Sequence, residues 1–269
     1  MKLQDKVAIV TGSNMGIGKA IARRLGREGA KVILNGRNEE RLEKTLAEFR
    51  REGITATACR ADVSNPEDCR ELAAHAVREF GQIDILVNNA GISAKGLFEE
   101  FQPEVFSRLV NTNLLGSVYA SLAALPHIKA SHGSILFISS LSGLRGLPHQ
   151  SPYSHTKMAQ TAIAESLRAE LSREGVHIGI VYVGITENDP EKKIYFSDGV
   201  YRNLNNGFKS LSDTQERVAQ TVFQTISRKK FKATVGWKGN AYYLLSRYSP
   251  WILDYVYRNH LEKIVKTDS

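Results

Sequence analysis

The chain alternates short apolar runs with longer amphipathic segments six times, and no other feature constrains its fold as strongly. Runs without polar alternation are typical of strands that are buried on both faces of a parallel sheet. Because helical patterns separate the runs, we expect a single doubly wound α/β domain with a parallel sheet of about seven strands. The six runs lie at 6–11, 31–34, 54–59, 83–87, 134–138 and 176–183, with a seventh strand expected at 232–235. We expect the domain to span 1–239, with a helical extension at 240–269 packed on it.

A glycine-rich turn follows the first apolar run and precedes a helical pattern that begins near Lys19. Glycines allow a tight turn and let the backbone approach a pyrophosphate, which the positive end of the next helix attracts. Such turns also occur in proteins that bind no phosphate, but the strand–turn–helix setting favours a dinucleotide site. The predicted cofactor-binding residues of this turn are Gly12, Ser13, Asn14, Gly16, Ile17 and Gly18.

The second apolar run ends at Gly36 and Arg37, where an acid would hydrogen-bond a ribose 2′-hydroxyl. The missing acid and the adjacent guanidinium favour NADP(H) over NAD(H), because Arg37 can bind a 2′-phosphate. Ser13 is the predicted second donor to that phosphate. The alternative is that Arg37 is a solvated residue preceding a helix.

Tyr153 and Lys157 are four residues apart in a segment expected to be helical from Ser151. At this spacing the two side chains lie on one face of a helix, where an ammonium lowers the pKa of a nearby phenol. Ser140 follows the run 134–138, at the sheet edge where open α/β sheets bind ligands. The spacing alone is also that of two ordinary neighbours on an amphipathic helix, so the interpretation depends on the rest of the chain.

Composition and charge narrow the class of protein further. The 269 residues carry a net charge of +8, and 215–269 hold ten Lys or Arg against four Asp or Glu. No nucleic-acid-binding motif accompanies this charge, so we expect no nucleic-acid partner. No uncharged apolar run is long enough to span a membrane, and the first residues lack a secretory signal, so we expect a cytoplasmic protein. Cys59 and Cys69 have no metal-ligand spacing, so no metal is expected.

At residues 5 to about 185 the sequence strongly resembles the short-chain dehydrogenase/reductase family, whose members have a Rossmann-type fold. Six separate motifs in the family's order carry the resemblance: Thr11-Gly12-x-x-x-Gly16-Ile17-Gly18, Asp62-Val63, Asn88-Asn89-Ala90-Gly91, Asn113 in Asn-Leu-Leu-Gly, Ser140, and Tyr153-x-x-x-Lys157. The resemblance implies an oxidoreductase that transfers hydride between the nicotinamide and a carbonyl or secondary alcohol.

The resemblance also implies a catalytic set of Asn113, Ser140, Tyr153 and Lys157. Tyr153 would be the general acid and Ser140 a second hydrogen-bond donor to the carbonyl oxygen. Lys157 would lower the Tyr153 pKa and hold the ribose, while Asn113 would position a water that links Lys157 to solvent. The further implied cofactor contacts are Asp62 and Val63 at the adenine, and Asn89, Ala90 and Gly91 beside it.

The sequence departs from the family pattern after the sixth run. Here Val183-Gly184 replaces the usual Pro-Gly, and Asn188 stands where a Thr is expected. The predicted nicotinamide contacts are therefore Gly184, Ile185, Thr186 and Asn188. Residues 187–212 are expected to form the substrate lid, which contains four aromatic side chains.

The C-terminal extension is rich in aromatic and basic residues, and Pro250 is expected to begin a helix. It either packs over the pocket or a neighbouring subunit, or contacts a membrane surface peripherally, because Trp and Tyr beside Arg and Lys suit that boundary. Together with the aromatic lid it suggests an extended, lipidic carbonyl substrate; a small polar substrate is the competing interpretation. We expect a homo-oligomer. A non-catalytic NADP(H)-binding sensor or scaffold of the same fold is the alternative function.

Overall fold

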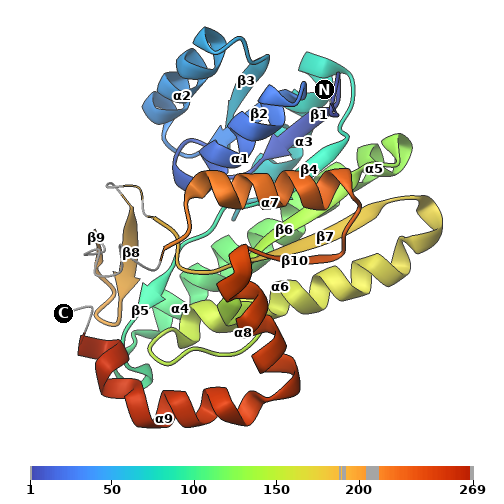
Figure 1. Cartoon of the computed structure of the whole chain (residues 1–269). Helices are drawn as coiled ribbons and strands as arrows, with labels where there is room; N and C mark the ends of the chain where they lie inside the picture. The colour runs from blue at the N-terminus through green and yellow to red at the C-terminus, as the bar shows by residue number, and fades with distance from the viewer. Residues whose placement is uncertain (1, 188, 190–191, 204–211, 267–269) are drawn as a thin grey trace.

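A seven-stranded parallel sheet forms the centre of the protein (Figure 1). The computed structural model describes residues 2–187, 189, 192–203 and 212–266, with the backbone alone described at 260–266. The strand order is β10-β7-β6-β4-β1-β2-β3, so the predicted parallel sheet of seven strands is confirmed. The strands are β1 Val7–Val10, β2 Lys31–Gly36, β3 Ala56–Arg60, β4 Ile85–Asn88, β6 Ser134–Ser140, β7 His177–Val183 and β10 Lys232–Thr234.

Helices cover both faces of this sheet. Alternate residues of β1 belong to different core clusters, since Ala8 and Val10 face one and Val7 and Ile9 face the other. Because both faces are packed, the inner strands β1, β4 and β7 are buried along their whole length, which explains the apolar runs in the sequence. On one face lie α1 Gly16–Arg27, α2 Glu39–Arg51 and α7 Gln215–Ser227; on the other lie α3 Pro66–Phe80, α5 Gly116–Ser131 and α6 Ser151–Glu170.

The helical segment from Pro103 to Ser131 is interrupted. It begins as α4 Pro103–Leu109, passes through a π-helical turn Val110–Leu115, and continues as α5. The turn contains Asn113, whose side chain bonds outside the helix, and π-helical turns of this kind frequently occur at functional sites.

The predicted lid contains regular structure instead of a single loop. Within it, β8 Lys193–Phe196 and β9 Tyr201–Asn203 form an antiparallel hairpin, and β8 also pairs with β5 Ala94–Lys95. The hairpin turn is local in origin, because Gly199 has a φ of 76° and the Asp198 carboxylate accepts a hydrogen bond from the Val200 amide. The hairpin is therefore anchored to the end of the sheet that carries the glycine-rich turn.

The C-terminal extension consists of α8 Gly236–Tyr248 and α9 Pro250–Lys266. Pro250 begins α9 as predicted, whereas the predicted boundary at 239/240 falls inside α8. Asp254 of α9 forms an ion pair with Arg145, which lies in the loop after Ser140, and the Tyr242 and Tyr257 hydroxyls are 2.7 Å apart. The extension thus packs against the domain. Among the described residues, no helix is long and apolar enough to cross a membrane.

Candidate active site

The glycine-rich turn has the geometry that binding of a pyrophosphate requires. Gly12 and Gly16 have positive φ values of 62° and 56°, and a Cβ on Gly18 would lie 2.1 Å from the Gly12 carbonyl oxygen. Nothing lies within 4 Å of where a Gly16 Cβ would stand. The N-terminus of α1 has no side-chain cap and no acidic residue in its first turn. This end of the helix therefore fits a dinucleotide phosphate.

Asn89 and Ala90, which follow β4, hold the glycine-rich turn by hydrogen bonds. The Asn89 side-chain amide donates to the Thr11 and Gly12 carbonyls at 2.9 and 3.0 Å. The Thr11 hydroxyl accepts from the Asn89 and Ala90 amides, each at 3.0 Å. Asn89 and Ala90 thus hold the shape of the site, which is a supporting role that the sequence motif does not reveal.

The predicted 2′-phosphate end contains one buried residue. The Ser13 side chain is fully buried and its hydroxyl accepts from the Asn35 amide at 2.9 Å, so it faces β2 in this structure, and its role as a phosphate donor stays a prediction. The absence of an acid at position 36 also has a steric reason, because a Cβ on Gly36 would stand 2.8 Å from the Asn14 side chain. Arg37 is exposed and lies 3.4 Å from the Asp62 carboxylate.

Asp62 and Val63 occupy different environments. Burial alone would raise the pKa of Asp62, but hydrogen bonds from the Ser64 amide and hydroxyl, together with Arg37, hold that pKa below its usual range. Asp62 is therefore ionised at neutral pH. Val63 is buried and packs closely against Gly116 at the start of α5, so its contact with an adenine is limited to what its edge exposes.

The lid hairpin contributes side chains to a hollow beside Arg37. The Tyr195 and Tyr201 rings are in tilted contact, with centroids 4.7 Å apart and planes inclined by 35°. Both line a hollow of about 230 Å³ together with Arg37, Asp62 and Arg108. Burial raises the pKa of Tyr201 and Tyr195 adds to that rise, while the positive charges of Arg37 and Arg41 oppose it. Arg41 and Tyr201 were missed from the sequence. Arg41 follows Arg37 by four residues, whereas nothing in the sequence links Tyr201 to them.

Ser140 and Tyr153 are brought together at the carboxyl edge of the sheet. Ser140 ends β6 and Tyr153 lies in the first turn of α6. Burial raises the pKa of Tyr153 and a hydrogen bond with Ser140 partly opposes that rise, so that the pKa is about 12. Tyr153 therefore holds its proton at neutral pH, as a general acid must.

The expected effect of Lys157 on Tyr153 is not found. The Lys157 ammonium lies 5.6 Å from the centre of the Tyr153 ring, and donates to the Ile138 carbonyl at 2.9 Å and to Gln160 Oε1 at 3.2 Å. Burial, and then Lys192, lower the pKa of Lys157 to about 7. In this structure burial outweighs the influences that lower the Tyr153 pKa.

Asn113 is fully buried, and its side chain bridges Ile92 and α6. Its amide oxygen accepts from the Ile92 amide at 2.8 Å, and its nitrogen donates to the Ile92 carbonyl and to Thr156. The Gln160 amide donates to the Asn113 backbone carbonyl at 2.7 Å and its oxygen accepts from Lys157, so a side chain connects Asn113 to Lys157. Gln160 was missed, although a glutamine three residues after Lys157 lies on the same face of the helix.

The loop after β7 leaves Ile185 exposed and Thr186 partly buried. The Thr186 hydroxyl donates to the Gly184 carbonyl at 3.2 Å, and a backbone bridge joins Thr186 to Asp213. Asn188 lies outside the described residues. On the other side of the site, the Gly91 backbone approaches Asn113 and Lys157 so closely that a Cβ there would stand 3.2 Å from Asn113 Oδ1.

Known proteins resemble this chain in both sequence and structure. A sequence profile described as short chain dehydrogenase matches residues 6–196. The 11-beta-hydroxysteroid dehydrogenase-like 4A protein of Arabidopsis thaliana is 40% identical over 190 residues, which cover 70% of this chain and 63% of that protein. The chain thus matches somewhat less than two thirds of this relative's length. The 11-beta-hydroxysteroid dehydrogenase-like 2 protein of the same plant is 31% identical, and the match covers 98% of this chain and 85% of that protein.

Two solved structures share the fold. An alcohol dehydrogenase from the archaeon Thermococcus sibiricus, complexed with 5-hydroxy-NADP, is 28% identical with a TM-score of 0.75, covering 85% of this chain and 95% of its own. A gluconate 5-dehydrogenase from Burkholderia cenocepacia, in complex with NADP and tartrate, is 25% identical with a TM-score of 0.79, covering 89% and 96%. By its sequence profile and its relatives, the chain belongs to the short-chain dehydrogenase family.

Proposed function

We propose that the chain is an NADP(H)-dependent oxidoreductase that interconverts a carbonyl and a secondary alcohol. The observation that carries the proposal is the hydrogen-bonded Ser140–Tyr153 pair at the carboxyl end of β6, with the phenol held protonated. Two adjacent hydroxyl groups suit a carbonyl oxygen that gains negative charge, because each can donate a hydrogen bond to it.

The residues have distinct roles in this reaction. Tyr153 gives its proton to the carbonyl oxygen, and Ser140 stabilises that oxygen by a hydrogen bond. Lys157 supplies the replacement proton, because its lowered pKa of about 7 lets it gain and lose a proton near neutral pH. Gln160 and Asn113 orient the Lys157 ammonium.

The glycine-rich turn and the α1 N-terminus would hold the cofactor's pyrophosphate, and Lys157 its nicotinamide ribose. When bound, the nicotinamide supplies or accepts the hydride. Arg37 and Arg41 support a preference for NADP(H), since Arg37 follows β2 and lines a hollow with Tyr201, Arg41 lies one helical turn further on, and no acid occupies position 36.

We infer an extended apolar substrate of steroid or lipid type. The support is twofold: Met158 and Ile185, on the elements beside the catalytic residues, are exposed, and the Arabidopsis relatives are named for hydroxysteroids. The cellular setting that suits this proposal is the cytoplasm, with the protein in a homo-oligomer.

A single assay tests the reaction and the substrate class. NADPH oxidation is followed with a homologous series of aliphatic ketones and a panel of keto-steroids, for wild type and Tyr153→Phe. We expect the catalytic efficiency to rise several-fold with each added carbon, because each buried methylene contributes about 0.8 kcal/mol. Tyr153→Phe should lower the rate about 10²- to 10⁴-fold while NADPH binding, measured by fluorescence, persists.

The outcomes separate the parts of the proposal. A Tyr153→Phe variant that reduces ketones at the wild-type rate would refute the catalytic role of the phenol. Tight NADPH binding without reduction of any carbonyl would indicate a sensor. Efficiency that stays flat along the series would reject the apolar substrate while leaving the reaction in place.

A further inference from the structure

Helix α8 presents an apolar stripe to the surface along its whole length. Trp237, Ala241, Leu244 and Tyr248 are spaced by four, three and four residues, which places them on one side of the helix. Trp237 and Tyr248 are 73% and 72% exposed, and Leu244 is 53% exposed. Nothing in the described part of the chain covers this stripe.

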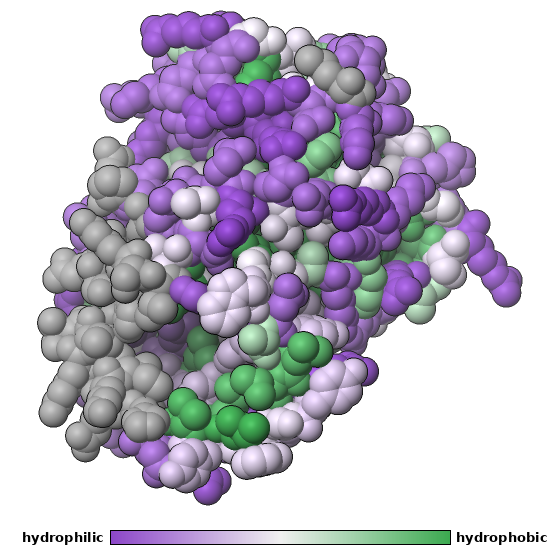
Figure 2. Space-filling view, in the orientation of Figure 1, coloured by the Kyte–Doolittle hydropathy of each residue, from purple (hydrophilic) through white to green (hydrophobic). Residues whose placement is uncertain are grey.

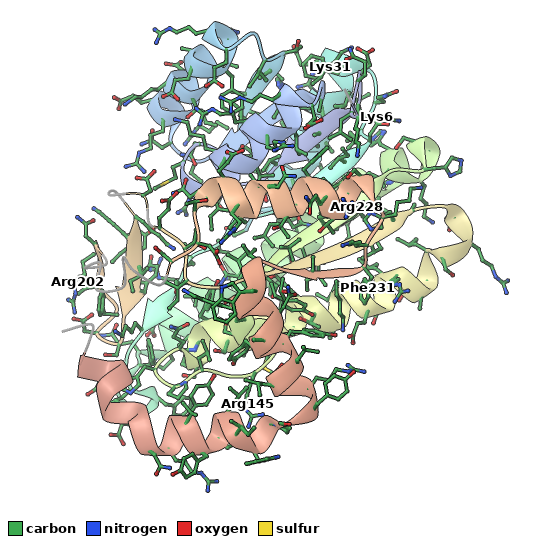
Figure 3. All side chains as sticks on the ribbon, viewed as in Figure 1. Lys6, Lys31, Arg145, Arg202, Arg228 and Phe231 are labelled. Atoms are coloured by element: carbon green, nitrogen blue, oxygen red, sulfur yellow. The ribbon has the colours of Figure 1, made fainter. Side chains whose placement is uncertain are left out.

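The stripe is continued on α9 by Trp251, Tyr255 and Val256, which are also exposed. Figure 2 shows hydrophobic residues gathered over the two C-terminal helices at the lower edge of the molecule. The opposite side of α9 is already anchored, because Leu253 is buried and Asp254 pairs with Arg145; Arg145 lies beside α9 in Figure 3. The exposed residues therefore contribute nothing to packing within the chain. An exposed apolar surface of this kind marks an interaction site.

A basic hollow of about 810 Å³ borders this surface. It lies between the end of α6, β10 and α8, and Arg168, Lys232, Arg247 and Tyr248 line it with Phe231, which is labelled in Figure 3. Lys232 is paired with Glu165 at 2.7 Å. The Arg168 and Arg247 guanidiniums lie over the rings of Phe231 and Tyr248, and among the described residues neither forms an ion pair. These two guanidiniums are thus available to a phosphate.

We propose that α8 and α9 dock on an anionic phospholipid bilayer, with lipid headgroup phosphates at Arg168 and Arg247. Tryptophan and tyrosine prefer the boundary between headgroups and acyl chains, and amphipathic helices with basic flanks lie in that plane. The exposed Lys238 and Arg258 add positive charge to the same two helices. Charge complementarity therefore favours a membrane over a second copy of this basic chain.

The docking is independent of the proposed reaction, but it has a mechanical connection to it. Arg145 lies in the loop that follows Ser140, and its ion pair with Asp254 joins that loop to α9. A membrane bound to the exposed side of α9 would therefore be connected to that loop through the helix itself, because Arg145 contacts the opposite side of α9.

The chain supplies its own probes for a test, because its two tryptophans both lie on this surface. Full-length protein, Trp237→Phe and Trp251→Phe are mixed with vesicles of phosphatidylcholine, with or without phosphatidylserine. We expect a blue shift of emission from each remaining tryptophan, and co-sedimentation, with the anionic vesicles only. Unchanged emission and no co-sedimentation would overturn the proposal.

Matched variants test the two parts of the surface. Leu244→Ser should weaken vesicle affinity several-fold, whereas Leu122→Ser, an equally exposed leucine on α5, should not. Arg168→Gln and Arg247→Gln should each weaken it about fivefold, and Arg51→Gln on α2 should not. Equal losses in the control variants would refute the assignment. A blue shift that depends on protein concentration in the absence of vesicles would indicate that a second copy of the chain covers the surface. Binding of inorganic phosphate without binding of vesicles would indicate a soluble ligand. Either result would overturn the proposal.

Discussion

Gln160 connects two members of the catalytic set, and replacing it should change how Lys157 holds its proton. The Gln160 side chain is 1% exposed; its oxygen accepts from Lys157 Nζ at 3.2 Å and its nitrogen donates to the Asn113 carbonyl at 2.7 Å. Gln160→Met preserves the length and volume of the side chain but removes both bonds. A hydrogen bond to a charged group contributes about 1.5–3 kcal/mol, so the Lys157 pKa should fall from about 7 by about one to two pH units.

Gln160→Glu provides the opposite perturbation at the same position. A carboxylate at hydrogen-bond distance favours the ammonium, so this variant should raise the Lys157 pKa by about one to three pH units. The unfolding free energy should fall by about 1–3 kcal/mol in Gln160→Met, because the buried Asn113 carbonyl loses its donor.

The measurement is an NMR titration of the lysine ε-carbons, with the Lys157 signal identified by its absence from Lys157→Met. The pH profile of the catalytic rate should shift in the same direction as the Lys157 pKa. If both Gln160 variants move the pKa in one direction, or if neither moves it, Gln160 only fills space and its proposed orienting role is wrong.

Two further predictions concern the cofactor and the pH dependence of stability. Arg37→Ala should weaken NADPH binding about ten- to hundredfold with little change in NADH binding, and Arg41→Ala should act in the same direction. Calorimetric titration measures both affinities. Equal affinity of the wild type for NADPH and NADH would contradict the proposed preference. Because burial lowers the Lys157 pKa, the unfolded chain binds more protons than the folded chain above about pH 7, so this group makes stability rise with pH. Between pH 7 and 8.5, denaturant titrations should show a slope up to about 1.4 kcal/mol per pH unit smaller in Lys157→Met than in wild type.

The parts of the fold that were predicted correctly depend on local sequence patterns. The five inner strands appear as apolar runs because both faces of the sheet are covered there, whereas the edge strands β3 and β10 are mostly only partly buried. The π-helical turn was missed because the contacts that favour it come from Ile92, Thr156 and Gln160, all distant from Asn113 in the chain. The same is true of the lid hairpin, whose partner strand β5 lies about a hundred residues earlier.

The candidate site shows the same division between local motif and distant contact. The motifs predict residues for a cofactor site, but they do not predict the hydrogen bonds that those side chains make within the chain. Ser13 and Asn89 lie in the right motifs, yet their polar atoms are used to bond β2 and the glycine-rich turn. Arg41 and Tyr201, which belong to no motif, lie beside Arg37.

Lys157 shows why a catalytic motif does not by itself determine protonation. The spacing of Tyr153 and Lys157 predicts an ammonium that acidifies a phenol, whereas burial acts on both groups and favours their neutral forms. The neutral phenol suits the direction in which a carbonyl is reduced, since that direction consumes the Tyr153 proton. A lysine that titrates near pH 7 can restore the proton without a large energetic cost. The pairing is therefore better described as a proton donor and its supplier, and Gln160 determines how readily the supplier is charged.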